Sequence, residues 1–148
     1  MPDGRRVRHR AYAYITNGSR LLVFRHVDAP QAGLQVPAGT IEPGEPPERA
    51  VLREAGEETG LAALTLVAFL GRDERDMSDC GVAELQHRWF FHLRCDGDPP
   101  ETWRHTETSG GTPIGFEFFW AALPNGVPQL VANYDDYVPR LLASMSVI

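Results

Sequence analysis

The chain has 148 residues, of which 43% are hydrophobic and 23% are charged, the composition of an ordinary globular protein with a sizeable core. Because 20 acidic residues outnumber 14 basic ones, the net charge of −6 argues against binding to duplex nucleic acid or to an anionic membrane. No apolar run approaches a membrane span, and no secretory signal is visible. Two cysteines are too few for a disulfide framework, so we expect one domain over residues 1–148 in a reducing cytoplasm.

The first half of the chain predicts a hairpin, a short strand and a loop that leads into a helix. The expected elements are strands at 7–16, 20–27 and 34–36, a Gly/Pro loop at 40–46 and a helix from Pro47 to about Thr59. Asn17-Gly18-Ser19 is a hairpin signal, Pro47 suits a first helical turn, and Gly60 suits a left-handed cap. Gly56 lies inside the helix, so we expect another backbone, the 39–45 loop, to pack closely there.

The second half predicts more strands and a closing helix. The expected elements are a strand at 63–71, a polar loop at 72–83, strands at 85–95 and 116–122, a long loop at 96–115 and an amphipathic helix at about 134–146. A loop as long as 96–115 is usually functional or disordered. The whole set indicates an α/β fold, an α/β/α sandwich with a mixed β-sheet. Two good helices are too few for the regular alternation of a doubly wound nucleotide fold.

Three carboxylates of the first helix have the spacing of a metal site. Glu54, Glu57 and Glu58 are related by i, i+3 and i+4, which gathers them on one helical face. Like charges on one face repel unless something compensates them, and a divalent cation is the usual compensation. Oxygen-only ligands favour Mg²⁺, Mn²⁺ or Ca²⁺ over Zn²⁺. The competing interpretation is a solvated surface helix laced with ion pairs.

The surrounding spacing resembles the signature box of the Nudix hydrolases. The defining positions are filled by Gly39, Glu45, Arg53, Glu54, Ala55, Glu57, Glu58, Gly60 and Leu61. Ala55 is small where the family takes a hydrophobic residue, but it is permitted. The resemblance implies a Nudix-type sandwich and Mg²⁺-dependent hydrolysis, with Mn²⁺ as a substitute, of a diphosphate linkage in a nucleoside diphosphate derivative by metal-activated water.

The resemblance also implies roles for residues of the box. Glu54, Glu57 and Glu58 would bind one or more cations together with the Gly39 carbonyl, and Glu45 would fix the loop or bind metal through water. Arg53 would hold a motif carboxylate by a two-point ion pair, although an ordinary i, i+4 pair with Glu57 would explain it equally simply.

The general base is left open by the resemblance, because the family takes it from the box or from a distant loop or strand. Candidates outside the box are Glu84, Glu101, Glu107 and Glu117. Glu117 interrupts an apolar strand, and a buried carboxylate there would need a partner such as a metal. We therefore assign Glu117 to the predicted metal site, against the alternative that it faces outward from an alternating strand.

Substrate contacts are expected from one aromatic residue and from arginines. Trp103 lies in a polar loop, which favours stacking on a nucleotide base over a place in the core. Arg10, Arg25 and Arg88 could bind phosphate, of which we select Arg25 and Arg88, although exposed strand positions would explain each equally well.

The choice among nucleotide-type substrates stays open. Residues 73–80 contain neither the Pro nor the Tyr that mark ADP-ribose and dinucleoside-polyphosphate hydrolases of the family. Those absences weaken two assignments and leave nucleoside triphosphates, nucleotide sugars and RNA 5′ ends open. A non-catalytic nucleotide-sensing domain is the alternative function, which we rank lower because no carboxylate of the box is lost. Homodimers are common in the family, so a homodimer is an expectation by analogy.

Overall fold

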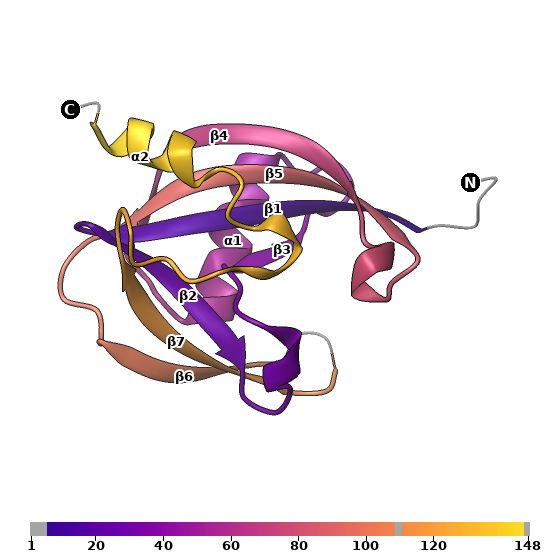
Figure 1. Ribbon diagram of the computed structural model, residues 1–148, viewed down its shortest axis with the longest axis horizontal. Helices are drawn as coiled ribbons and strands as arrows, with labels where there is room; N and C mark the ends of the chain where they lie inside the picture. Colours follow the sequence, from indigo (N-terminus) through magenta and orange to yellow (C-terminus); the bar gives the residue numbers. More distant parts are fainter. Residues whose placement is uncertain (1–5, 109–110, 147–148) are drawn as a thin grey trace.

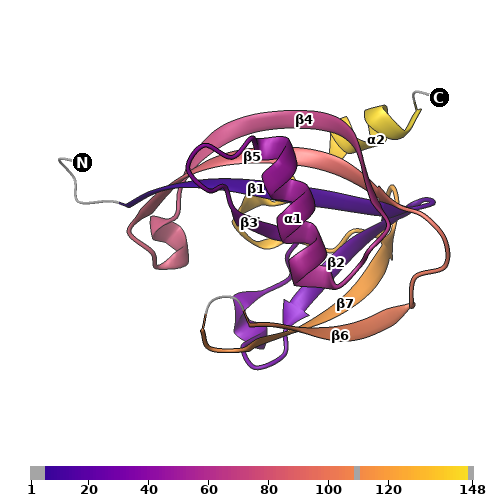
Figure 2. The same ribbon diagram turned by 180° about the vertical axis from the view of Figure 1, so that it is seen from behind.

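A seven-stranded mixed sheet with one helix on each face forms the fold (Figures 1 and 2). The computed structural model describes residues 6–108 and 111–146. Its strands are β1 (Arg6–Asn17), β2 (Arg20–His26), β3 (Ala38–Thr40), β4 (Leu64–Asp76), β5 (Glu84–Cys95), β6 (Thr102–Glu107) and β7 (Ile114–Ala122). Its helices are α1 (Pro47–Thr59) and α2 (Val138–Ser146).

Strand β1 is the centre of the sheet, whose order is β4-β5-β1-β2-β7-β6 with β3 paired to β1. It runs parallel to β5 along most of its length and antiparallel to β2 and β3. Its middle pairs with β3, from Arg10 opposite Thr40 to Tyr12 opposite Ala38, and its end pairs with β2. Strand β3 leads directly into the loop before α1, so the central strand anchors the segment that resembles the Nudix box.

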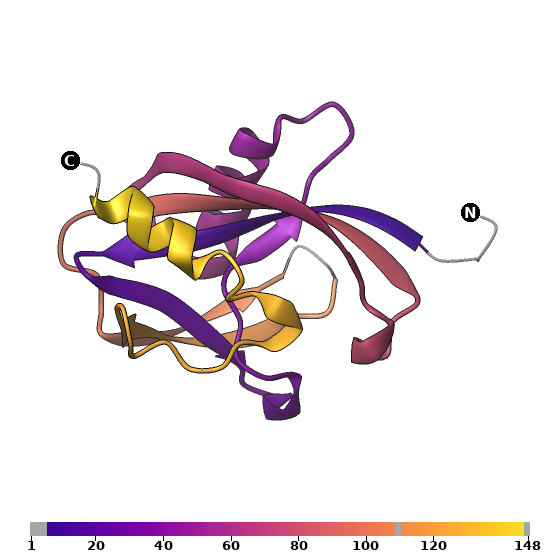
Figure 3. The same cartoon turned by 45° about the horizontal axis from the view of Figure 1, so that its top comes forward.

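Alternation along β1 and β5 divides the core into two layers. One face carries Ala11, Ala13 and Ile15 and packs with Phe91 and Leu93 beneath α1. The other face packs beneath α2 and the segment before it, and includes Tyr12, Tyr14, Phe90, Tyr137 and Leu141. The helices therefore lie on opposite sides of the sheet, as Figure 3 also shows. The predicted α/β/α sandwich with a mixed sheet is confirmed.

Two predicted loops contain strand. Strand β4 continues to Asp76, so much of the predicted loop at 72–83 pairs with β5 despite its charged sequence. Strand β6 occupies part of the predicted loop at 96–115 and pairs with β7, with Trp103 opposite Phe118 and His105 opposite Phe116. Both strands lie at the ends of the sheet order, where polar side chains on the solvent side hide the alternating pattern.

Smaller differences concern element boundaries. The predicted strand at 34–36 makes only an isolated bridge between Gln35 and Phe24, and the strand lies slightly further on as β3. Helix α2 begins at Val138 instead of 134. The expected close backbone approach at Gly56 is wrong, because a Cβ there would meet only the Leu61 carbonyl at an ordinary 3.7 Å. The hairpin and the Gly60 cap are confirmed, with Gly60 at φ 78°.

His92 of β5 is a buried histidine held between two hydroxyl groups beneath α2. Its Nε2 lies 2.8 Å from the Thr16 hydroxyl and its Nδ1 lies 3.0 Å from the Ser144 hydroxyl. Burial, and secondarily the nearby Arg94, lower the pKa of His92 below its ordinary value of 6.5. The neutral ring therefore fits the folded state better than the imidazolium does.

This burial makes stability depend on pH in one direction. Below about pH 6.5 the unfolded chain binds a proton at His92 before the folded protein does, so folding stability is lost as pH falls. His92→Asn should destabilise the protein near pH 7.5, and the gap to wild type in unfolding free energy should shrink towards about pH 5. Urea unfolding at several pH values measures that gap. A gap that stays constant or widens on acidification contradicts the prediction.

Candidate active site

The loop between β3 and α1 turns the chain sharply and delivers the helix with its acidic side exposed. Glu45 closes the loop by accepting the Glu42 N–H at 3.0 Å, while its own N–H donates to the Glu42 carbonyl at 2.9 Å. Pro46 is extended at φ −62°, and Pro47 opens the helix, where its missing N–H costs nothing. Ala50, Val51 and Ala55 bury the opposite side of α1 against the sheet.

Arg53 organises the acidic side chains of the loop and the helix. Its Nε and Nη2 donate to the two carboxylate oxygens of Glu45, both at 2.9 Å. Its Nη1 donates to Glu54 at 2.8 Å and lies 3.6 Å from Glu57, and its Nη2 also reaches the Thr40 carbonyl at 3.2 Å. The Arg53 hydrogen bonds lower the pKa of Glu45 to about 2. The structure thus places Arg53 in contact with three acidic side chains, and its contact with Glu57 is the longest of the three.

Gly39 lies against the side chain of Glu54. A Cβ built at this glycine would overlap the carboxylate end of Glu54, so only glycine leaves room for that side chain on β3. The pKa of Glu54 is raised, first because the group is desolvated, although Arg53 opposes the shift.

We therefore expect Gly39→Ala to push the Glu54 carboxylate out of place while leaving the strand intact. Hydrolytic kcat should fall about tenfold or more, since each 1.4 kcal/mol of lost transition-state stabilisation is tenfold. Gly44→Ala is not a suitable control because Gly44 has a positive φ of 78°, whereas Gly115→Ala meets only ordinary contacts to Val27 at 3.6 Å. Steady-state assays of both variants check this, and equal losses would contradict it.

Glu58 is the most deeply desolvated acid of the helix. Its Oε1 accepts the Ala38 N–H at 3.2 Å, which draws the side chain to the start of β3. Burial raises the pKa of Glu58 to about 8, against the opposing effects of the Ala38 hydrogen bond and Arg10. A cation bound beside Glu58 would favour the charged form and offset this burial.

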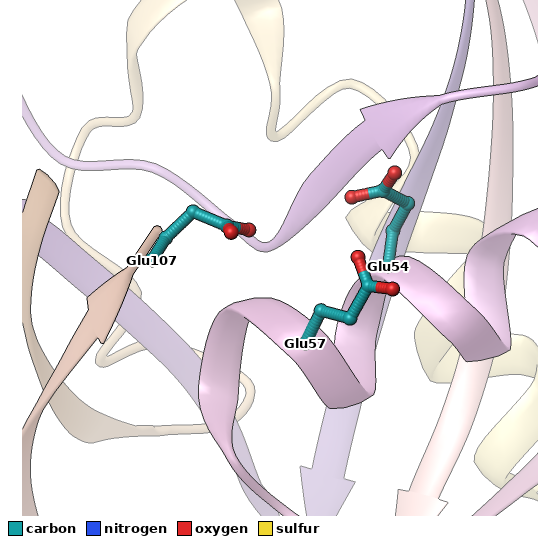
Figure 4. A group of neighbouring side chains, drawn as sticks. All are labelled: Glu54, Glu57 and Glu107. Carbon is teal, nitrogen blue, oxygen red and sulfur yellow. The ribbon is translucent and has the colours of Figure 1, made fainter. Parts of the chain in front are cut away.

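A carboxylate from β6 joins those of the helix. One oxygen each from Glu54, Glu57 and Glu107 lie within 4.8 Å of one another, and Figure 4 shows Glu107 extending towards the two helix residues. Negative groups gathered at this distance repel one another, and all the donor atoms are hard oxygens. The donor set therefore fits a magnesium-type or manganese-type cation. Within residues 6–108 and 111–146, the grouping includes neither Glu58 nor Glu117.

Strand β6 is attached to the C-terminal end of α1 by two ring nitrogens. Trp103 Nε1 donates to the Thr59 carbonyl at 2.9 Å, and His105 Nε2 lies 2.9 Å from the Glu57 carbonyl. These carbonyls belong to the last turn of the helix, where acceptors lack helical partners. Since Trp103, His105 and Glu107 alternate along β6, the same face that holds the helix also presents the third carboxylate.

Trp103 accordingly has a structural place instead of the predicted contact with a base. Its ring stacks on Phe118 with centroids 5.1 Å apart, in addition to the helix hydrogen bond. The signal for Glu107 was present in the sequence as the period-two spacing of positions 103, 105 and 107. The polar, Gly- and Pro-rich composition of residues 96–115 obscures this spacing.

The predicted metal ligand Glu117 lies on the other face of β7 from the core residues Phe116 and Phe118. It forms ion pairs with Arg25 at 3.0 Å and with Arg104 at 3.3 Å, and these residues are its register partners on β2 and β6. Glu117 therefore pairs with two arginines instead of the predicted metal ion. Arg25, a predicted phosphate contact, is paired with this carboxylate.

Arg88 is buried on the α2 side of the sheet. It donates to both oxygens of Asp73, at 2.7 and 2.8 Å, and to the Ala132 carbonyl at 2.7 Å. Its side chain is only 1% exposed. This residue joins β4, β5 and the segment before α2, so the structure gives it a structural role in place of the predicted phosphate contact.

Comparison with known proteins places this architecture in a family. Residues 6–123 match the family model described as the NUDIX domain. The chain therefore belongs to the Nudix family. As a Nudix hydrolase it is an enzyme with pyrophosphohydrolase activity in the general sense, and such enzymes act on nucleotide derivatives with the help of a divalent metal.

Solved structures share the fold at low sequence identity. A MutT Nudix hydrolase from Burkholderia pseudomallei is 24% identical, with a TM-score of 0.64 over 92% of this chain and 98% of that one. A MutT protein from Methanosarcina mazei Go1 is 19% identical, with a TM-score of 0.67 over 96% and 97%. A UDP-X diphosphatase is 18% identical, with a TM-score of 0.60 over 94% of this chain and 63% of that one.

Neither helix in the part of the chain that the structure describes is both long enough and apolar enough to cross a membrane.

Proposed function

We propose that the protein hydrolyses a diphosphate linkage in a nucleoside diphosphate derivative, with Mg²⁺ as its cation and Mn²⁺ as a substitute. The observation that carries this proposal is the grouping of Glu54, Glu57 and Glu107 within 4.8 Å, beside Gly39 and Glu58. Two separate elements, α1 and β6, bring these three carboxylates together, on a frame held by Arg53.

In this proposal the carboxylates of Glu54, Glu57 and Glu107 hold the cation, and Glu58 and the Gly39 carbonyl extend the ligand set. When bound, the cation would lower the pKa of a water and neutralise charge on the diphosphate. Arg53 holds Glu54 by a hydrogen bond and lies within ion-pair distance of Glu57, and neither contact depends on substrate. Such positioning and charge neutralisation supply most of what phosphoryl transfer requires, without a covalent intermediate.

The substrate class is tested by turnover of a panel with Mg²⁺ at slightly alkaline pH. The panel contains nucleoside triphosphates, 8-oxo-dGTP, ADP-ribose, dinucleoside polyphosphates, NADH and coenzyme A. It also contains sugar nucleotides, since one structural neighbour is named a UDP-X diphosphatase. Products are separated by chromatography, with Glu58→Gln as the blank. One substrate hydrolysed far above the blank supports the proposal, whereas binding without turnover across the panel favours a nucleotide sensor.

A further inference from the structure

The guanidinium of Arg10 on β1 lacks the carboxylate partner that other arginines of the described residues have. Its Nε is buried and has no hydrogen-bond partner among the residues that the structure describes. Within those residues Arg10 forms no ion pair. Its guanidinium carbon lies 5.9 Å from the centroid of the Tyr12 ring. Burying a polar group without a partner is costly, so the buried Nε of this guanidinium calls for an explanation.

Three other arginines of the protein are each paired with a carboxylate. Arg88 lies directly beside Arg10 in the register of β1 and β5, and binds Asp73 through two hydrogen bonds. Arg53 binds Glu45 in the same two-point manner, and Arg25 pairs with Glu117. Arg10 thus differs from each of them, because no carboxylate of residues 6–108 and 111–146 lies within ion-pair distance of it.

Arg10 shares the α2 side of the sheet with Tyr12 and Arg88, and its position on β1 adjoins the candidate active site. It pairs with Thr40 of β3, two residues beyond Ala38, whose N–H binds Glu58. Its charge is close enough to favour ionisation of both Glu54 and Glu58. Burial opposes the charge on Arg10 itself, but Tyr12, Tyr134 and Glu58 together outweigh burial and keep the pKa of Arg10 above its ordinary value.

A metal ion held by those carboxylates would add a second positive charge beside the Arg10 guanidinium. Two cations facing each other in a partly buried site repel, unless an anion lies between them and contacts both. A diphosphate group is such an anion, and the planar guanidinium fork matches phosphate oxygens. We propose that Arg10 binds a phosphate of the diphosphate substrate, on a site adjoining Glu58. This inference rests on the proposed function and adds a specific anion-binding residue to it.

Two binding measurements without turnover test the role of Arg10. The first is the affinity of the metal-free protein for Mn²⁺ alone, from the signal of free Mn²⁺ in electron paramagnetic resonance. The second is the affinity of the Mn²⁺-loaded protein for inorganic pyrophosphate, by calorimetry. For Arg10→Met we expect pyrophosphate affinity to fall about tenfold to a hundredfold, as for a lost charged hydrogen bond. Mn²⁺ affinity should be unchanged or higher, because a repelling charge has been removed.

A merely structural Arg10 would give a different pattern. If Arg10→Met loses affinity for both Mn²⁺ and pyrophosphate, Arg10 supports the carboxylates, and the inference is overturned. If its pyrophosphate affinity is unchanged, Arg10 contacts no phosphate, and the inference is again overturned. Wild-type protein that binds no pyrophosphate overturns it as well. If Arg10→Met does not fold, Arg10→Lys keeps the charge without the fork and should lose pyrophosphate affinity about fivefold or more. Arg94→Met, an exposed change on β5, should alter neither affinity.

The outcome is separable from that of the proposed function. Absence of turnover in the substrate panel, with Arg10-dependent pyrophosphate binding, would leave the anion site standing and the hydrolysis refuted. Turnover of a substrate, with pyrophosphate affinity that is the same in wild type and Arg10→Met, would support the hydrolysis and refute the anion site.

Discussion

Glu58→Gln is expected to lower kcat by about a hundredfold or more, the size of loss seen when one charge-stabilising group is removed from an active site. Glu58 offers a half-buried carboxylate at the start of β3, and only the charged form attracts a cation. Glutamine keeps the shape and can still accept the Ala38 N–H. The variant should therefore fold normally while binding metal weakly.

Two measurements separate this effect from misfolding. Without metal, the melting temperature of Glu58→Gln should be no lower than that of wild type, because the amide avoids burying a charge. With Mg²⁺ or Mn²⁺, wild type should gain stability by linkage and the variant should gain much less. Glu48→Gln, which changes an exposed acid in the first turn of the same helix, serves as the matched control. A loss in kcat below about tenfold for Glu58→Gln would refute the assigned mechanism.

Arg53→Lys is expected to lower kcat by roughly tenfold to a hundredfold, although the charge is retained. Lysine presents a single ammonium and cannot span both oxygens of Glu45 while also reaching Glu54 and Thr40. The loop and the helix would then lose the link that sets the position of the Glu54 and Glu57 carboxylates. Arg53→Ala should be worse, because those carboxylates would also lose their countercharge.

Steady-state kinetics of Arg53→Lys, Arg53→Ala and the control Arg94→Lys provide the measurement. Arg94 pairs with the exposed Asp96 at 2.8 Å, so its replacement tests a conservative change of an ordinary surface pair. The expected order of kcat is wild type equal to Arg94→Lys, then Arg53→Lys, then Arg53→Ala. Full activity in Arg53→Lys would mean that charge alone suffices and that the fork has no role.

The helix, its glycine cap and its acidic face could be predicted because each depends on neighbours in the sequence. Pro47, Gly60 and the spacing of Glu54, Glu57 and Glu58 are local signals, and the structure places them as a helical turn requires. The core layers also follow from alternation along β1 and β5. These features need no knowledge of which strand lies beside which.

The remainder of the site depends on pairings between distant segments. The polar sequence around Trp103 favours a loop with an available ring. In the structure, β6 pairs with β7, the Trp103 ring stacks on Phe118, and its N–H donates to the Thr59 carbonyl of α1. Glu117 looked isolated in an apolar strand, but the neighbouring strands supply Arg25 and Arg104. The sequence is compatible with an exposed Arg88, but β4 extends past residue 73 and places Asp73 opposite Arg88. Each error arose from a partner on a segment that is distant in the sequence.

The attachment of β6 to the end of α1 has a consequence for how the site comes into being. Glu57 and Glu107 meet only after β6 has paired with β7 and docked on the end of α1. Contacts between distant segments form late because closing long loops costs entropy. A peptide that spans the whole box would lack Glu107 and the two ring nitrogens that fasten β6. Metal affinity would then report the docking of β6, and bound metal would in turn hold this terminal strand of the sheet in place.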